Sequence, residues 1–69
     1  MDVNATHKTL IRYGTVVTDV VVPDSDVRVT HYLLDGNLYM VVMRNGDVVQ
    51  LANLSCKDSG IIHSVQVQL

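Results

Sequence analysis

Two hairpin-turn signals, Asp35-Gly36 and Asn45-Gly46, divide residues 27–54 into three runs of nearly equal length. Asp-Gly and Asn-Gly are favoured in two-residue hairpin loops, because both central residues of such a loop take positive φ. The runs around them are rich in Val, Leu, Tyr and Met, which is typical of β-strands. We therefore expect a three-stranded antiparallel meander over residues 27–54.

The two turns also fix which residues lie opposite each other, and side chains alternate between the two faces of a strand. The predicted cross-strand pairs are Leu33–Leu38, Tyr32–Tyr39, Arg44–Asp47, Met43–Val48 and Val42–Val49. One face then carries Val27, Val29, His31, Leu33, Leu38, Met40, Val42, Val49 and Leu51. Its apolar character predicts that this face is the core.

The second face of the meander is also apolar along its middle. It carries Arg28, Thr30, Tyr32, Leu34, Tyr39, Val41, Met43, Val48, Gln50 and Ala52. The central strand is apolar at all positions from 38 to 43. A strand that is apolar on both sides is normally covered on both sides. We therefore expect the remaining strands, another subunit or a ligand to lie over this face.

The rest of the chain favours further strands and almost no helix. Residues 1–8 are polar and predict a loosely ordered lead-in, while residues 9–22 are strand-like around Gly14, which indicates a bulge, a bend or a break. Residues 23–26 form a turn signal, and residues 61–69 alternate as a half-buried strand does. The predicted fold is all-β: one small domain, residues 1–69, of five to six antiparallel strands in a small barrel or a strongly curved sheet.

A chain of 69 residues can bury only a small core, and such domains usually gain stability from disulfides, metals or oligomerisation. Cys56 is the only cysteine, so no internal disulfide can form. His7, His31 and His63 are scattered without ligand spacing, so we expect no metal and no cofactor. Self-association is the remaining device, most simply as a two-fold dimer, and we expect a homo-oligomer.

The net charge of −2 argues against a protein that binds nucleic acid by neutralising phosphates. The sequence has no apolar run long enough to span a bilayer and no signal-peptide pattern at its start. With a single thiol, these features predict a cytoplasmic protein.

The residues whose side chains could act in catalysis or ligand binding favour binding over catalysis. No nucleophile or acid–base motif surrounds Cys56 or the serines, so we expect no enzyme activity. His31 and His63 would meet only if their strands were neighbours. The candidate binding residues are Arg28, Tyr32, Tyr39 and Met43. The tyrosine pair could stack a planar group while Arg28 holds an anion, or it could simply stabilise the hairpin or an interface.

The leading hypothesis is a small non-enzymatic binding protein that acts as a homo-oligomer, with a protein target or a small anionic ligand as partner. In size it resembles accessory proteins of phages and mobile elements, many of which inhibit a host protein or sequester a small signalling molecule. One alternative is a nucleic-acid- or nucleotide-binding small β-barrel. Another is a structural assembly subunit.

Overall fold

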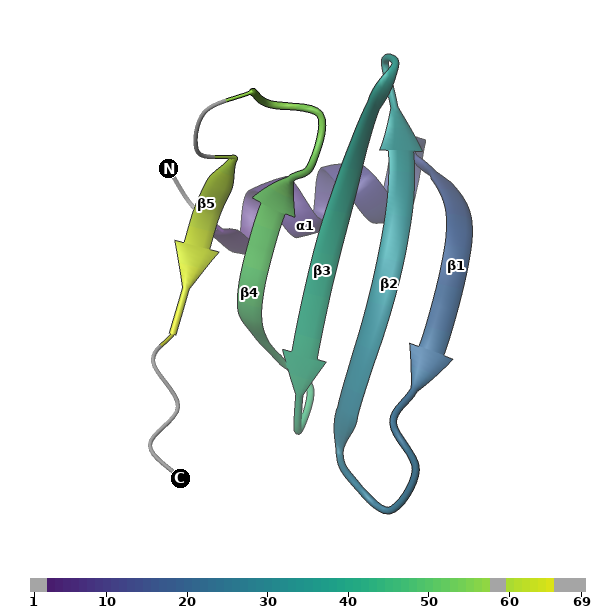
Figure 1. Ribbon diagram of the computed structural model, residues 1–69, viewed down its shortest axis with the longest axis vertical. Helices are drawn as coiled ribbons and strands as arrows, with labels where there is room; N and C mark the ends of the chain where they lie inside the picture. The colour runs from purple at the N-terminus through teal and green to yellow at the C-terminus, as the bar shows by residue number, and fades with distance from the viewer. Residues whose placement is uncertain (1–2, 58–59, 66–69) are drawn as a thin grey trace.

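The structure, a computed structural model, describes residues 3–57 and 60–65. One helix precedes five strands that form a single antiparallel sheet in the order β1-β2-β3-β4-β5 (Figure 1). The elements are α1 (Val3–Tyr13), β1 (Thr15–Val21), β2 (Val27–Leu34), β3 (Asn37–Arg44), β4 (Asp47–Asn53) and β5 (Ile61–Ser64). The predicted meander is confirmed as β2, β3 and β4.

Both predicted hairpin turns are present. Asp35 and Gly36 have φ values of 52° and 77°, and Asn45 and Gly46 have values of 52° and 81°. Positive φ at both central residues is the geometry that matches the right-handed twist of the flanking strands. The turns therefore connect β2 to β3 and β3 to β4 as the sequence predicts.

The predicted register holds along β2 and β3 but shifts by one residue in β4. Leu33 lies opposite Leu38, and Met43 lies opposite Val48. Val42, however, pairs with Gln50 and not with Val49, because a β-bulge interrupts the ladder between Val42 and Met43. An extra residue in one strand reverses the facing of every residue beyond it. Leu51 consequently lies on the same face as Val41 and is fully buried there.

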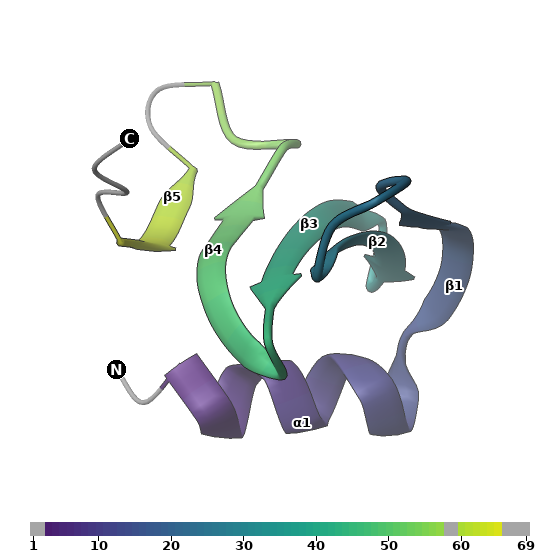
Figure 2. The ribbon, with the colours of Figure 1, turned by 90° about the horizontal axis from the view of Figure 1, so that it is seen from below.

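The N-terminal segment is where the structure differs most from the sequence-based prediction. Residues 3–8 are no loose lead-in, and residues 9–13 are no strand: together they form α1. Leu10 of α1 is 1% exposed and packs on the second face of the meander, where its buried neighbours are Tyr32, Val41 and Leu51. The cover over that face is thus a helix of the same chain. Figure 2 shows α1 along one side of the sheet.

The face that we expected to be the core is therefore the face without the helix. The core lies between α1 and the other side of the sheet, where Val41 is fully buried, whereas Val42 on the opposite side is half-buried. The reason for this reversal is that both faces of the meander are apolar, and the single helix α1 can cover only one of them.

Gly14 marks the junction of α1 and β1, where its N–H donates to the carbonyl of Leu10 at 2.9 Å. A Cβ at Gly14 would lie within 2.6 Å of that carbonyl oxygen, so only glycine fits here. The β1–β2 ladder has its own irregularity between Val16 and Thr18. The predicted turn at residues 23–26 is confirmed, with the Ser25 hydroxyl bonded to the carbonyl of Val22 at 2.9 Å.

The sheet is open: β1 and β5 are its two edges, and they are not paired with each other. The predicted antiparallel strands are confirmed, but a barrel is not. Because β2 and β5 are separated by two strands, the possible contact between His31 and His63 does not occur. His63 lies opposite Leu51 instead. Residues 66–69 of the predicted last strand lie outside the described residues.

Candidate binding surfaces

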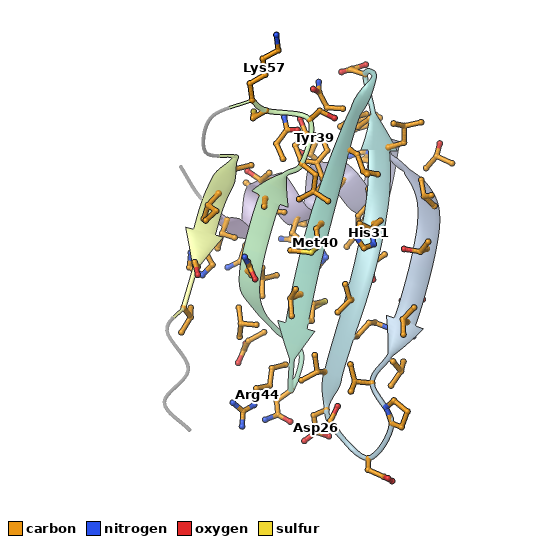
Figure 3. All side chains as sticks on the ribbon, viewed as in Figure 1. Asp26, His31, Tyr39, Met40, Arg44 and Lys57 are labelled. Carbon is orange, nitrogen blue, oxygen red and sulfur yellow. The ribbon has the colours of Figure 1, made fainter. Side chains whose placement is uncertain are left out.

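The side of the sheet opposite α1 is an apolar surface over which no other described element lies. We call it the open face; it consists of Thr18, Val20, Val29, His31, Leu33, Leu38, Met40 and Val42. Its centre is the cross-strand pair His31 and Met40, which Figure 3 shows side by side. Leu33 is 45% exposed and Val20 54%. Apolar surface of this kind is typical of an interaction site.

His31 is the one ionisable side chain in the middle of the open face. Its Nδ1 lies 2.7 Å from the hydroxyl oxygen of Thr18 on β1, within hydrogen-bond distance. A histidine bonded in this way to a neighbouring strand has a structural role in the sheet. The described residues contain no cluster of three His, Cys, Asp or Glu side chains that could hold a metal ion.

The edge strand β1 is exposed at every one of its seven residues. Four of them are valines, and the exposed fractions of Val16, Val17, Val20 and Val21 are between 54% and 56%. Natural edge strands are usually protected by lysine, proline or a covering element, because their outward N–H and C=O groups can pair with another chain. β1 contains no lysine or proline. Its protection consists of the irregularity between Val16 and Thr18 and the single charged side chain of Asp19.

A small hollow of about 280 Å³ lies at the end of the sheet where the β1–β2 loop meets the β3–β4 turn. It is lined by Val21, Ser25, Asp26, Val27, Arg28, Met43 and Gly46. The two loops are joined there by a hydrogen bond from the N–H of Asn45 to the carbonyl of Asp26 at 3.3 Å. Two of the predicted binding residues, Arg28 and Met43, line this hollow.

The charge of Arg28 is partly committed to its own sheet. Its Nε lies 3.1 Å from a carboxylate oxygen of Asp19 on β1, and the two side chains are 55% and 42% exposed. The same oxygen accepts a hydrogen bond from the hydroxyl of Thr30 at 3.1 Å. Thr30 is buried, so Asp19 supplies the partner that its hydroxyl needs. Asp19 therefore points inward over β2, and its charge is balanced there by Arg28.

The two predicted tyrosines are indeed cross-strand partners, but they lie on the helix side. Tyr32 is 8% exposed and belongs to the core, and Tyr39 packs against that core while half-buried. Burial, together with the charge of Asp19, raises the pKa of Tyr32. The structure therefore brings Arg28 and Met43 together at the hollow and places Tyr32 beneath α1. Stacking of a planar ligand on Tyr32 would require α1 to move.

The open face was not predicted to be a surface, because α1 was not predicted from the sequence. A signal for the helix exists: Val3, Thr6, His7 and Leu10 follow the i, i+3, i+4, i+7 spacing of one helix face, and all four are at least half-buried. Only two of them are apolar, and the strand-like residues that follow obscured the pattern.

Cys56 is a free thiol in the exposed loop after β4. Among the described residues, no helix is long and apolar enough to cross a membrane. Comparisons of the chain with protein-family models, with curated proteins and with solved structures found no match.

Proposed function

We propose that this protein is a non-enzymatic interaction protein that works as a homo-oligomer, and that two copies meet through their open faces. The observation that supports the proposal is that a contiguous apolar sheet surface is left without cover by the chain's own described elements. Two such faces can pack on each other about 10 Å apart, as in other sheet-on-sheet interfaces. A two-fold axis would bring the same residues of both copies together.

The size of the open face indicates how strong this contact is. Three strands spaced about 4.8 Å apart, over about six residues each, give a face of roughly 300 Å² per copy. Two copies would bury roughly 600 Å² in total, below the 1,200 Å² or so of a stable standard interface. The expected face-to-face contact is therefore weak and reversible, in the micromolar range or above.

The proposal includes a cytoplasmic location and a partner for the assembly. That partner is a host protein that the assembly inhibits, or a small signalling molecule that it sequesters. A small anionic ligand would have its best place in the hollow beside Arg28. The nucleotide-binding alternative has less support, because Tyr32 is buried under α1. A structural assembly subunit would use the open face in the same way.

Sedimentation velocity of the wild type, Leu33→Lys and Ile11→Lys tests the proposal. Leu33 is on the open face, Ile11 is on the outer side of α1, and they are 45% and 58% exposed, so neither lysine should disturb the monomer fold. We expect the wild type and Ile11→Lys to associate at tens of micromolar. Leu33→Lys should weaken that association at least tenfold, because its charge would be buried in the contact.

The proposal would be wrong if Leu33→Lys and Ile11→Lys associated equally well. It would also be wrong if the wild type remained a monomer over the whole concentration range. Circular dichroism of each variant establishes that a loss of association is not a loss of folding.

A further inference from the structure

We infer that the edge strand β1 forms a second contact between copies of this chain, an antiparallel pairing of β1 with β1 of another copy centred on Val20. The inference deepens the proposed function, since it rests on self-association and names the edge that takes part. Apart from Thr18 and Val20, which also belong to the open face, this contact uses different residues from the face-to-face contact. The two contacts can therefore fail separately.

The hydrogen bonding of the hairpin determines which backbone groups of β1 are directed outward. The N–H of Val22 donates to the carbonyl of Val27 on β2 at 2.9 Å. Backbone groups of successive residues alternate between the two edges of a strand. Val22, Val20 and Thr18 therefore direct their backbone groups toward β2. Asp19 and Val21 direct theirs away from the sheet, where another strand could bind them.

Only one register around these outward groups is free of conflict. Centring on Asp19 would place two carboxylates opposite each other, which is unfavourable. Centring on Thr18 would use the irregular stretch at Val17, and centring on Val21 would pair Asp19 with Pro23, which has no N–H. Centring on Val20 separates the carboxylates and leaves Val17 and Pro23 just beyond the ends of the paired stretch, residues 18–22.

In the register centred on Val20, Asp19 of each copy lies opposite Val21 of the other. These are the residues with outward backbone groups, so each pair exchanges two hydrogen bonds and the contact gains four. Thr18 lies opposite Val22, and Val20 lies opposite Val20 across the two-fold axis. On the open-face side the new ladder is thus lined by the β-branched side chains Thr18, Val20 and Val22, an arrangement that favours pairing. On the helix side Asp19 lies opposite Val21.

The charges of the helix side complement each other in the same register. Val21 lies opposite Arg28 in the β1–β2 ladder. Asp19 of one copy would therefore stand in line with Val21 and Arg28 of the other, about 10 Å from that arginine between Cα atoms. Long side chains cover such a distance, so each Arg28 can be shared between its own Asp19 and that of the second copy. The two Asp19 side chains lie diagonally across the new ladder, about 7–8 Å apart. Each Asp19 has an arginine of both copies within reach, which makes a second copy a better match than an arbitrary apolar strand.

The pairing would join two five-stranded sheets into one continuous sheet and place two open faces side by side. That doubles the area available for face-to-face packing, from roughly 600 Å² to roughly 1,200 Å² between two such pairs, which reaches the lower end of the range of stable interfaces. Two different two-fold contacts of this kind close into a tetramer.

Cysteine cross-linking tests the pairing and its register. In a Cys56→Ser background, Val20→Cys should oxidise to a covalent dimer, because the Cα atoms of a directly opposed, non-hydrogen-bonded pair are about 4.5 Å apart. That distance is within the range for a disulfide. Val22→Cys, directly after β1, is the matched control: its two copies would be about 13 Å apart along the strand direction. We expect at least a tenfold higher yield of dimer from Val20→Cys.

Equal yields from the two cysteine variants, or no dimer from either, would overturn the inference. A repeat in the Leu33→Lys background separates the two contacts. If Val20→Cys still cross-links there, the edge contact exists without the face-to-face contact. If the wild type associates but Val20→Cys never cross-links, the edge contact is wrong while the proposed function stands.

Proline at Val21 supplies a second measurement. It removes an outward N–H that the β1–β2 ladder does not use, and such positions on edge strands tolerate proline. Val21→Pro should stay folded by circular dichroism and should sediment as a species half the size of the wild type. A folded Val21→Pro protein that assembles like the wild type would refute the pairing.

Discussion

Two adjacent valines in the middle of β3 should differ clearly in how much stability the same substitution removes. Val41 is fully buried between α1 and the sheet, and Val42 is half-buried on the open face. Replacing Val41 by alanine removes two methyl groups, each worth about 0.8 kcal/mol of burial. The cavity left behind adds to that loss, so the expected total is about 2–3 kcal/mol.

The same change at Val42 should cost about 1 kcal/mol or less in the isolated monomer, because its side chain already contacts solvent. A domain of 69 residues is expected to have a free energy of unfolding of roughly 3–10 kcal/mol. Val41→Asp, which also buries an unpaired charge, should therefore unfold the protein. Val42→Asp should leave it folded.

Urea denaturation followed by circular dichroism measures both free energies of unfolding. It should be carried out at the lowest practical concentration, so that association through the open face does not add to the stability of the wild type. If Val42→Ala proved as damaging as Val41→Ala, or more so, the assignment of the core to the helix side would be wrong.

Two further predictions concern the turns and the helix. Gly46→Val should destabilise the protein by about 1–2 kcal/mol because Gly46 has a φ of 81°, whereas Lys57→Val in the exposed loop should change stability by less than about 0.5 kcal/mol; equal melting temperatures would contradict the turn geometry. Burial lowers the pKa of His7 below its usual value of 6.5. Stability from its neutral ring is therefore complete above the unfolded pKa and is lost as the pH falls below it toward the lowered folded pKa. The melting temperature should consequently drop more between about pH 8 and pH 5 in the wild type than in His7→Gln, and parallel pH profiles would refute this.

The meander could be predicted because its turns have local sequence signals, whereas features that depend on long-range packing could not. Asp35-Gly36 and Asn45-Gly46 specify their turns through φ alone, so the pairing of β2 with β3 follows directly from the sequence. The bulge after Val42 has no comparable signal, because Val48 and Val49 are equally suited to either face. The position of Leu51 in the core could not be predicted for that reason.

The choice of the core face depended on an element with weak propensity signals. α1 has only Val3 and Leu10 as apolar contacts with the core, and its stability comes from packing on the sheet. Without the helix, the face with Leu33, Met40 and Val42 is as suitable a core as the face with Tyr32 and Val41. Of the candidate site, Arg28 and Met43 were named from the sequence and line the hollow, whereas the open face was mistaken for the interior.

The stoichiometry of the wild-type protein is the most direct test of the account, which holds that uncovered sheet surface joins copies of this chain. Native mass spectrometry from a solution at tens of micromolar reports that stoichiometry, together with any ligand that remains bound. The account predicts dimers and tetramers of the 69-residue chain, with the tetramer increasing as the concentration rises. A protein found only as a monomer under these conditions would contradict it.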